Sequence, residues 1–475
     1  MPEQSMFNKI LIANRGEIAC RIITTAQQLG IHCIAVYSDV DKDAHHVALA
    51  AADSYLNIPR ILQVAVQSGA QAIHPGYGFL SENATFAEAC QQYSLIFIGP
   101  PLAAITAMAS KSAAKNIMAA AGVPLVPGYH GDDQSDKMLT QESHKIAYPQ
   151  LLKAAYGGGG KGMRIVNQAD EFAAALAAAR REAKAGFGND KVLIERYLTK
   201  PRHVEIQLFS DNHNNCIYLS QRDCSIQRHH QKVLEEAPAP NLPISAQVAM
   251  GEAAVAAAQA INYQEAGTVE FLYDENGTFY FMEMNTRLQV EHPVTEMITG
   301  LDLVAWQLQI ANGDPLTQAH VTVSGHAIEV RIYAEDPNND FLPASGQLAF
   351  LCQPTPSRHV RIDTGVRQGD HISPFYDPMI AKLIVWDENR HLAIQRMQRA
   401  LDDYRIASIK TNLPFLTQRV HANPFKAAEL YTCFINTHAA MLLPAATQCD
   451  EQTLILAVLA LRLCQVQKEA HAAQQ

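Results

Sequence analysis

Residues 267–292 read GTVEFLYDENGTFYFMEMNTRLQVEH, and this stretch predicts a β-hairpin with a polar site at its end. Asn276-Gly277 between two apolar runs favours a two-residue type I′ turn, because asparagine and glycine tolerate the positive φ that both central residues adopt. The pairing that follows from such a turn places Glu270 directly opposite Glu283. We therefore expect two carboxylates to face each other across one antiparallel ladder.

Beyond the hairpin turn, polar side chains recur at every second position. In an extended chain alternate side chains share one face, so we expect these polar groups to project together while the apolar residues between them face the core. The polar residues at these positions are Glu283, Asn285, Arg287, Gln289 and Glu291.

The facing carboxylates need a physical reason, because like charges opposite one another destabilise a sheet. A divalent cation that bridges Glu270 and Glu283 supplies one, and carboxylates without a nearby histidine or cysteine suit Mg²⁺ or Mn²⁺. A solvent-facing hairpin with tolerable repulsion is the alternative, and the hairpin alone favours neither. The next motif favours the metal.

That motif is the glycine loop in KAAYGGGGKGMR (153–164). It is not a Walker A loop, because Gly162 follows Lys161 where a serine or threonine would stand. Consecutive glycines favour a flexible flap whose backbone N–H groups can close over phosphates. A mobile linker is the alternative, and the flanking Lys153, Lys161 and Arg164 count against it.

A third cluster lies in QRDCSIQRHHQKVLEEAPAP (221–240), where Arg228, His229, His230 and Lys232 bring cationic and hydrogen-bonding groups together. Such a cluster predicts a site for a small oxyanion. Each histidine alone is more typical of a structural hydrogen bond, and the spacing does not indicate zinc.

In HAIEVRIYAEDP (326–337), Arg331 shares a strand face with Glu329 and Tyr333. Taken alone, this segment is an ordinary solvated strand whose meaning depends on what lies opposite. A carboxylate metal site, a glycine flap and an oxyanion cluster together indicate nucleotide-driven activation of a small acid, because phosphoryl transfer needs positioning and charge neutralisation above all.

Composition narrows the function classes. A chain of 475 residues suggests about three units at ~150 residues each. The net charge of -10 and the pI near 6.0 argue against a general nucleic-acid binder. Nine scattered cysteines without a C-x-x-C fit reduced thiols. No apolar run is long enough for a membrane span or a signal core, so we expect no membrane contact and a cytoplasmic protein.

Strands alternate with helices at the start of the chain, which predicts a parallel α/β sheet. Its expected strands lie within KILIAN (9–14), CIAVYS (33–38), AIHPG (72–76) and IFIGP (96–100). After an alanine-rich helix at 114–121, a second unit holds PQLLKA and KVLIERYL as strands around the glycine loop and a helix at 171–185. Strands dominate again from HVEIQLF (203–209), and the tail from residue 453 has helical periodicity.

The order of these motifs resembles a known family: the sequence looks like a biotin carboxylase, an ATP-grasp enzyme, across roughly residues 6–445. The fold class implied is α/β (α+β): an ATP-grasp fold with an N-terminal Rossmann-like domain, a mobile glycine-rich lid and a C-terminal mixed-sheet domain. The matching stretches are KILIANRGEIACRI, AIHPGYGFLSEN, GGGGKGMR, PRHVEIQ, RDCSIQRHHQKVLEEAPAP, AGTVEF, EMNTRLQVEHPVTEMITG, FLPASG and FYDPMIAKLIV.

The resemblance also implies a division of the chain. The tail is similar to the segment that follows this domain in long acyl-CoA carboxylase α chains of the methylcrotonyl type, and a free-standing subunit stays open. The expected units are 1–110 (Rossmann-like domain), 111–204 (lid subdomain), 205–330 (catalytic subdomain), 331–445 (C-terminal domain) and 446–475 (helical tail).

The resemblance implies that the chain binds ATP with Mg²⁺ or Mn²⁺. Glu270, Glu283 and Asn285 match the metal-binding positions, in agreement with the hairpin argument. The residues that match nucleotide contacts, lid included, are Lys111, Lys153, Gly158, Gly159, Gly160, Met163, Glu195, Arg196, Tyr197, Leu198, His203, Gln227 and His230.

For the chemistry, the resemblance implies that Glu291 is the base that deprotonates bicarbonate for attack on the γ-phosphate. Arg331 matches the residue that stabilises the biotin enolate, and Lys232 and Arg287 match catalytic anion-binding positions. The residues that match the pocket for bicarbonate and biotin are Lys232, Arg287, Gln289, Val290 and Arg331.

Three departures from the family pattern stand out. About one strand, ~5 to 10 residues, is missing near residues 50–53, which would leave the first sheet short at an edge. Thr24 and Gln28 stand where some members carry charged dimer contacts, so a homodimer is left open. No AMKM biotinylation motif occurs, so biotin must come on a separate carrier domain or as free biotin, and a carboxyltransferase subunit is the expected partner.

The sequence leaves two alternatives to this enzyme. One is another ATP-grasp ligase that joins a carboxylate to an amine, and the RHHQK and NTRLQVEH stretches argue against it. The other is a non-catalytic assembly module of a carboxylase complex, which the missing strand favours and the intact site residues oppose.

Overall fold

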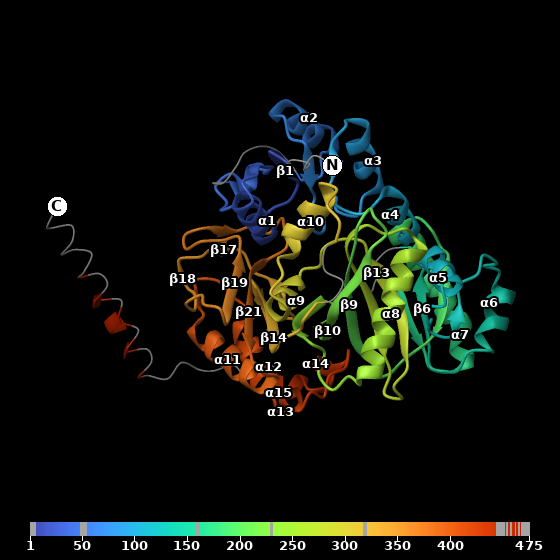
Figure 1. Cartoon of the computed structure of the whole chain (residues 1–475). Helices are drawn as coiled ribbons and strands as arrows, with labels where there is room; N and C mark the ends of the chain where they lie inside the picture. Colours follow the sequence, from blue (N-terminus) through green and yellow to red (C-terminus); the bar gives the residue numbers. More distant parts are fainter. Residues whose placement is uncertain are drawn as a thin grey trace.

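A computed structural model of the chain describes residues 6–47, 55–156, 162–228, 231–316 and 321–442, with scattered helical positions between 452 and 466. The missing-strand prediction near residues 50–53 falls outside this range. Three larger sheets organise the described part: a four-stranded sheet near the N-terminus, a second four-stranded sheet, and an eight-stranded sheet between them and the C-terminal helices (Figure 1).

The N-terminal sheet is parallel, with the order β2-β1-β3-β4, as the alternation of strands and helices predicts. Its central strands are almost wholly buried, because helices cover a parallel sheet on both faces. The elements are β1 (Lys9–Ile12), α1 (Gly16–Gln28), β2 (His32–Ala35), α2 (Ile58–Ser68), β3 (Ala72–His74), α3 (Ala84–Gln92), β4 (Ile96–Phe97), α4 (Leu102–Met108) and α5 (Lys111–Ala120).

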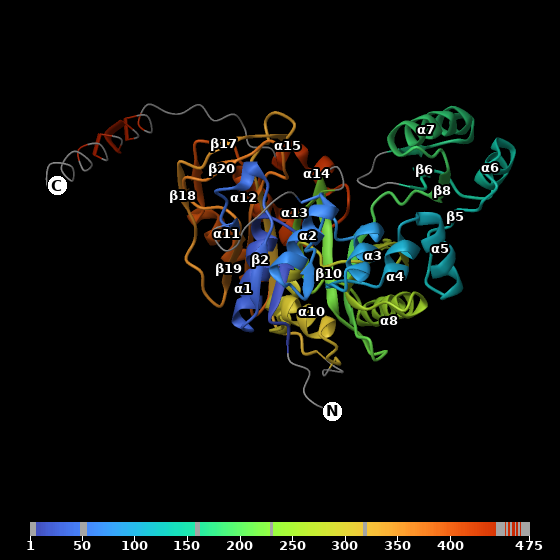
Figure 2. The ribbon, with the colours of Figure 1, turned by 90° about the horizontal axis from the view of Figure 1, so that it is seen from above.

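The second four-stranded sheet has the order β5-β8-β6-β7 and lies beside the main body with its two helices (Figure 2). Gln150 is buried on its strand β6 and is satisfied: its amide nitrogen donates to the carbonyls of Ser143 and Ile146 at 2.7 and 2.8 Å. The elements are β5 (Gly128–Tyr129), α6 (Asp136–Ser143), β6 (Gln150–Ala154), β7 (Met163–Val166), α7 (Phe172–Phe187) and β8 (Val192–Arg196).

The eight-stranded sheet has the order β13-β12-β9-β10-β11-β14-β21-β19 and carries most of the predicted polar positions. The predicted boundary after residue 330 falls inside β14, so this sheet runs through it, and the division into units stays a prediction. The strands are β9 (Arg202–Ser210), β10 (Cys216–Arg228), β11 (Gln231–Ala237), β12 (Glu265–Tyr273), β13 (Phe279–Asn285), β14 (His326–Tyr333), β19 (Val360–Thr364) and β21 (Met379–Asp387).

The prediction that Glu270 faces Glu283 is confirmed, although the predicted turn is wrong. Asp274 and Thr278 close the hairpin, with residues 275–277 between them, and Gly277 has a positive φ while Asn276 does not. A type I′ turn needs a positive φ at both central residues. The loop is therefore one residue longer than predicted.

A β-bulge compensates for the longer loop. Near the loop, Phe271 pairs with Phe281, and the next pair along the ladder is Glu270 with Glu283, so Met282 is an extra residue on β13. The two one-residue departures cancel at the position of the carboxylates. The predicted extended face is wrong beyond Asn285, where β13 ends and a loop leads into α9 (His292–Thr299).

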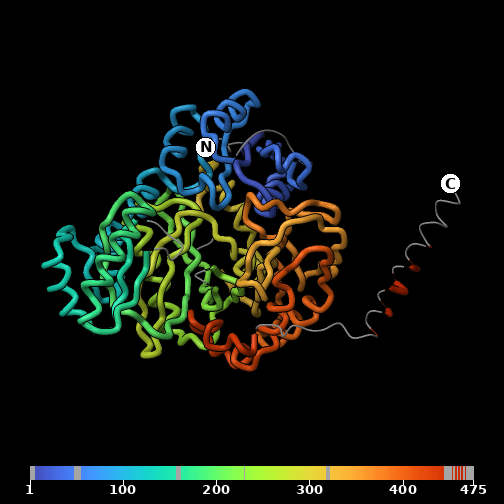
Figure 3. Tube along the Cα trace, turned by 180° about the vertical axis from the view of Figure 1, so that it is seen from behind, coloured from blue at the N-terminus to red at the C-terminus, as the bar shows by residue number. Residues whose placement is uncertain are grey.

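Helices cover the two faces of the large sheet at different places. α8 (Ile244–Ala260) packs on β9, β10 and β12, whereas α9 packs on β10, β11, β14 and β21 (Figures 1 and 3). α10 (Leu303–Ala311) lies against α1 and β12. β14 is buried along its whole length, so the solvated strand expected from its sequence alone is wrong.

The C-terminal region wraps small strand pairs and helices around β14 and β21. Its core joins residues of α11 and α12 to the inner side of the sheet, which buries most of their apolar side chains. No described helix has the length and apolar character to cross a membrane. The remaining elements are β15 (Glu335–Asp336), β16 (Leu342–Pro343), β17 (Gly346–Gln347), β18 (Phe350–Cys352), β20 (His371–Ile372), α11 (Arg390–Asp403), β22 (Arg405–Ala407), α12 (Leu413–His421), α13 (Asn423–Lys426), α14 (Phe434–Thr437) and α15 (Ala439–Leu442).

Candidate active site

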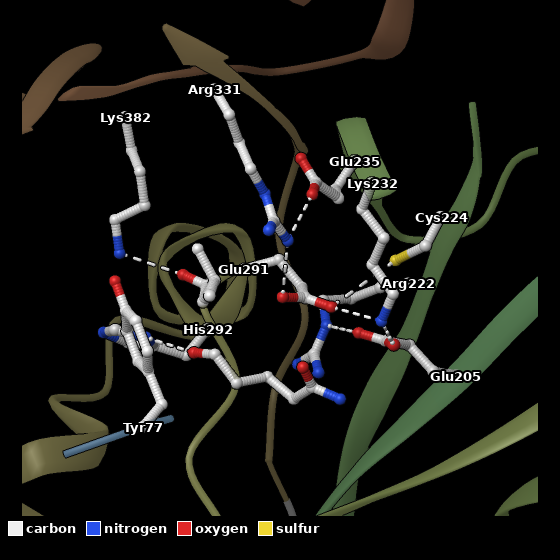
Figure 4. Close-up of polar contacts among 12 residues, drawn as sticks. Tyr77, Glu205, Arg222, Cys224, Lys232, Glu235, Glu291, His292, Arg331 and Lys382 are labelled. Atoms are coloured by element: carbon white, nitrogen blue, oxygen red, sulfur yellow. Dashed lines mark hydrogen bonds and ion pairs between the residues drawn. The ribbon is translucent and has the colours of Figure 1, made fainter. Parts of the chain in front are cut away.

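Lys232 on β11 is the centre of the polar site, because its ammonium contacts three carboxylates. Nζ donates to Glu205 Oε2 at 2.6 Å, to Glu270 Oε1 at 2.8 Å and to Glu291 Oε1 at 2.6 Å. The acids come from β9, from β12 and from the residue before α9, and Figure 4 shows Glu205 and Glu291 beside Lys232. A lysine has three N–H donors, so all of them are used. The fold thus gathers groups that are far apart in the sequence around one cation.

The charges around Glu291 keep this acid ionised. Burial opposes its ionisation, but Lys232, Arg331 and Arg222 outweigh burial and hold the pKa of Glu291 well below its usual range. The same carboxylates outweigh burial at Lys232 and raise its pKa well above the usual value. Glu291 is therefore a carboxylate that can accept a proton, with a permanently charged lysine beside it.

Arg222 on β10 holds Glu205 of this cluster in place. Its guanidinium is wholly buried and donates to Glu205 Oε1 at 2.5 Å, to Gln207 at 2.8 Å and to Thr295 at 2.9 Å. Neither Glu205 nor Arg222 is predicted from the sequence. No pattern in the sequence separates them from the other polar residues of β9 and β10; the fold shows that they are buried, and buried charges must be paired.

Arg331 on β14 links the cluster to a further acid. Its Nη2 atom lies 2.6 Å from Glu235 Oε1 and donates to Glu291 Oε2 at 3.0 Å (Figure 4). The guanidinium is buried, so its attraction to both acids is weakly screened. The structure thus places Arg331 and Glu291 in contact, and their roles stay predictions.

The predicted metal positions lie on the other side of Lys232. Glu270 Oε1 accepts from the side-chain amides of Asn285 and Gln289, each at 2.9 Å, and Glu270 Oε2 lies 2.9 Å from His203 Nε2. Burial and Glu270 together raise the pKa of Glu283, while its position opposite Glu270 leaves two carboxylates facing one space.

This donor set fits a hard divalent cation. Two carboxylates and an amide oxygen are oxygen ligands of the kind that Mg²⁺ prefers, and Mg²⁺ completes its shell with waters and substrate phosphates. The raised pKa of Glu283 indicates a carboxylate that needs positive charge nearby. Glu270, Glu283 and Asn285 are the residues that would hold the ion.

The predicted phosphate-binding lysines border the same space. Lys153 on β6 and Lys115 on α5 contact the two oxygens of Glu195 at 2.6 and 2.5 Å. Burial lowers the pKa of Lys111, and the nearby Glu283 opposes this shift. Lys115 is missing from the sequence predictions; its recurrence one helical turn after Lys111 is the signal that could have found it.

The predicted nucleotide contacts at 195–198 lie at the end of β8 and at the start of the connection towards β9. The side chain of Arg196 contacts Asp274 at 2.7 Å, and the backbone N–H of Tyr197 donates to the Pro149 carbonyl at 2.8 Å. Leu198 is buried, and Met163 on β7 pairs with Lys153. Gln227 lies 3.4 Å from His203, so the structure brings these two predicted nucleotide contacts together.

Arg287 is held at the mouth of the site by a residue of the N-terminal unit. Its Nε donates to Glu82 Oε2 at 2.9 Å, and its Nη2 donates to the side-chain oxygen of Asn285 at 3.2 Å. The carbonyl of Val290 accepts from Lys382 Nζ at 2.9 Å. The sequence analysis does not predict the contact between Glu82 and Arg287.

Two predicted groupings are not formed. Arg228 does not join Lys232: it lies over the ring of Phe341 at 4.3 Å and near Glu335 at 3.6 Å. Arg164 pairs with Glu182 of α7. The predictions for Gly158, Gly159, Gly160, Lys161, His229 and His230 fall outside the described residues.

Family comparisons match nearly the whole chain. Residues 6–105 match the biotin carboxylase N-terminal domain, residues 110–319 match the ATP-binding domain of the carbamoyl-phosphate synthase L chain, and residues 329–437 match the biotin carboxylase C-terminal domain.

Curated relatives give the same result. The mitochondrial methylcrotonoyl-CoA carboxylase subunit α of Dictyostelium discoideum is 53% identical over 97% of this chain and 68% of its own length. The biotin carboxylase of Nostoc sp. is 51% identical over 90% of this chain and 98% of its own length. For the rat methylcrotonoyl-CoA carboxylase subunit α the covered share is 65%, so the chain spans about two thirds of these α subunits.

Solved structures resemble the fold closely. One is the biotin carboxylase domain dimer of Hydrogenobacter thermophilus 2-oxoglutarate carboxylase with MgADP, ADP and bicarbonate, at a TM-score of 0.89 and 42% identity over 93% of this chain and 100% of that one. Another is the biotin carboxylase of Campylobacter jejuni in a β,γ-ATP complex, at a TM-score of 0.88 and 42% identity over 91% of this chain and 99% of that one.

Proposed function

The chain belongs to the biotin carboxylase family of ATP-dependent ligases, and from this premise we propose that it carboxylates biotin with ATP and bicarbonate in two steps on the cluster around Lys232. The observation that carries the proposal is the contact of Glu291 with both Lys232 and Arg331. One ionised acid thus lies between a cation suited to bicarbonate and a guanidinium suited to an enolate.

In the first step, Glu291 takes the proton of bicarbonate, and Lys232 and Arg287 hold the anion. An oxygen of the resulting carbonate attacks the γ-phosphorus of ATP, and carboxyphosphate and ADP are formed. Lys232 already holds three carboxylates, so bicarbonate binding requires it to exchange at least one of these contacts for the substrate. The low pKa of Glu291 fits a base that is ionised before bicarbonate arrives.

We place the metal and the nucleotide on the side of Lys232 where Glu270 lies. Mg²⁺ bound there would supply charge neutralisation for the phosphates of ATP. Glu270, Glu283 and Asn285 would hold it, and Lys111 and Lys153 approach the phosphates as point charges. The residues 195–198 line the adenine, and Mn²⁺ is a second ion that this oxygen-rich set accepts.

In the second step, carboxyphosphate decomposes to CO₂ and phosphate, and the phosphate takes the N1′ proton of biotin. The biotin enolate then attacks CO₂ through N1′. Arg331 stabilises the enolate oxygen, because a guanidinium in a site without bulk water interacts strongly with a developing anion.

The whole-protein setting is a proposal in the same sense. The relatives named methylcrotonoyl-CoA carboxylase subunit α support the biotin carboxylase part of an acyl-CoA carboxylase α chain. Biotin would arrive on a carrier domain, and a carboxyltransferase subunit would use the product. A homodimer is supported by the dimer named for the Hydrogenobacter domain. The named methylcrotonoyl-CoA carboxylase subunits are mitochondrial, and the cytoplasmic location stays a prediction.

The decisive measurement is ADP release from Mg-ATP with and without bicarbonate and free biotin. We expect turnover that needs bicarbonate, rises with biotin and is lost in Glu291→Gln, which keeps the shape of the side chain but cannot accept the proton. Glu182→Gln is the matched control, because this glutamate is exposed on α7 and should leave turnover unchanged.

The opposite outcome is equally informative. A folded protein that binds ATP but releases no ADP in response to bicarbonate and biotin, even with a carrier domain, contradicts the enzyme. The non-catalytic assembly module would then take its place.

A further inference from the structure

A second pair of glutamates faces across the same sheet, behind Arg331. Glu235 on β11 pairs directly with Glu329 on β14, and both side chains are fully buried. Glu329 and Arg331 stand two residues apart on one strand, so they share the face that α9 covers. Two ionised carboxylates at such a position would repel each other in a medium that screens them poorly.

The cations near this pair are unevenly distributed. Arg331 Nη2 lies 2.6 Å from Glu235. Lys382, which pairs with Arg331 across β14 and β21, donates to the Val290 carbonyl and lies 3.3 Å from Glu17 and 3.6 Å from Asp363. Within the described part of the chain, no carboxyl oxygen of either glutamate has a hydrogen-bond partner, so the ion pair with Arg331 is what distinguishes Glu235 from Glu329.

The uneven distribution of cations determines which of the two glutamates, Glu235 or Glu329, holds a proton. An ionised carboxylate without a close cation or donor is costly in a protein interior, whereas a neutral carboxyl there costs much less. Burial raises the pKa of Glu329 well above its usual range, with Glu235 and Glu291 adding to the shift and Lys382 and Arg331 opposing it. Glu329 is therefore the neutral member.

Glu235 can be protonated or ionised near neutral pH. Burial and Glu291 raise its pKa to about 7, against the attraction of Arg331 and Lys232. Cys224 on β10 also faces these acids, and burial raises the pKa of its thiol well above the usual value, so it stays neutral. Two acids thus contact one nitrogen of Arg331, and only Glu291 is ionised across the whole physiological range.

We propose that Glu235 is a positioning residue for Arg331, and that Glu329 holds a proton which leaves the facing pair with one negative charge. The proposal rests on the proposed function, because Arg331 is the group that meets the biotin enolate. When Glu235 is ionised, it draws Arg331 away from Glu291, which frees the base. When Glu235 takes a proton, Arg331 pairs with Glu291 alone and covers it.

The test is the pH dependence of biotin-stimulated ADP release between about pH 6 and pH 9, with the bicarbonate concentration held constant. In the native protein we expect turnover to rise as pH passes through about 7, where Glu235 ionises. Glu235→Gln should lose this rise and stay low throughout, roughly 10-fold to 100-fold below the native rate at high pH. Glu329→Gln should keep both the rise and the rate within about twofold, because it replaces one neutral group by another.

An infrared measurement tests the proton without using activity. Glu265 is another buried carboxyl whose pKa burial raises well above its usual value, so the signal of Glu329 is measured as a difference between variants. At about pH 8 the carbonyl stretch of protonated buried carboxyls should lose intensity in Glu329→Gln relative to the native protein, and should keep its intensity in Glu235→Gln. Thermal unfolding of each variant shows whether it folds. If the native chain shows no turnover, the proposed function fails, yet this band still decides where the proton lies.

Three results would overturn the proposal. One is a Glu235→Gln variant that loses the same factor at every pH and keeps the rise, because that marks a purely structural role. Another is a Glu329→Gln variant whose rise moves to lower pH, since a shift of that kind requires an ionised Glu329. The third is a protonated-carboxyl band whose intensity is the same in Glu329→Gln as in the native protein.

Discussion

Two glutamate pairs face each other across one sheet, and they differ in how their repulsion is relieved. Glu270 of the first pair contacts Lys232 and His203 and accepts from two amides, and its partner Glu283 faces the space predicted for Mg²⁺. In the second pair only Glu235 has a cation, and Glu329 has no hydrogen-bond partner among the described groups. The same pairing of like charges thus marks a cation site in one place and a buried proton in the other.

The largest expected effect comes from removing the charge of the first pair. Glu270→Gln should lower biotin-dependent ADP release by roughly a thousandfold, because the carboxylate both orients Lys232 and offers an oxygen to the metal. Steady-state turnover with saturating Mg-ATP measures this loss, and Glu329→Gln is the control on the second pair. Equal effects of the two variants would remove the distinction between the pairs.

A third glutamate sharpens the comparison, because Glu236 follows Glu235 directly and points to the other face of β11. It accepts from His326 at 2.7 Å and from Arg390 at 2.6 and 3.0 Å. Against burial, the contacts with His326 and Arg390 lower the pKa of Glu236 to about 2. A carboxylate with a depressed pKa stabilises the folded state above its unfolded pKa, and this contribution is lost as pH falls towards the folded value.

The corresponding measurement is the free energy of unfolding in urea for the native chain and for Glu236→Gln. The variant should be about 3 kcal/mol less stable near pH 5.5, and the gap should shrink to about 1.5 kcal/mol near pH 3. A gap that is independent of pH would mean that the ion pairs around Glu236 contribute nothing through its charge.

The next prediction tests whether the facing carboxylates of Glu270 and Glu283 destabilise the fold when no Mg²⁺ is bound. Glu283→Gln should raise the Mg²⁺ concentration for half-maximal turnover by about tenfold, since one anionic ligand is lost. In the absence of Mg²⁺ its melting temperature should not fall, because the substitution removes repulsion from Glu270. A lower melting temperature without Mg²⁺ would show that Glu283 stabilises the sheet by itself.

The smallest expected effect concerns the proton of the second pair. Glu329→Leu replaces a buried carboxyl that lacks a hydrogen-bond partner in the described structure by an apolar side chain of similar size. The free energy of unfolding should stay the same or rise by about 1 kcal/mol. A loss of more than about 2 kcal/mol, measured in urea near neutral pH, would show that Glu329 is ionised and paired in solution.

The sequence predicts the helices and strands better than the turns that connect them. The parallel N-terminal sheet, the alanine-rich helix and the strands around the glycine loop appear where the periodicity places them. The pairing of Glu270 with Glu283 is also correct, but only because a longer turn and a bulge at Met282 cancel. Turn length depends on local hydrogen bonds at Asp274 and Thr278, and these leave no mark in the hydrophobic pattern.

The site shows the same limit. Arg287, Gln289 and Glu291 approach the cluster although they lie on a loop, not on the extended strand predicted for them. Their convergence follows from the chain turning into α9. Glu205 and Arg222 escape prediction because their role is visible only when β9 and β10 lie side by side, so that one buried charge meets the other.

The helix α9 gives this arrangement a mechanical consequence. Glu291 immediately precedes the helix, and Glu296 in its second turn binds Arg21 of α1 at 2.9 Å and Arg361 of β19 at 2.6 Å. A single short helix therefore connects the proposed base to α1 and to β19, because Glu296 is held by both elements. A displacement of α1 would therefore reach the proposed base over about one and a half turns of helix, without passing through a substrate contact.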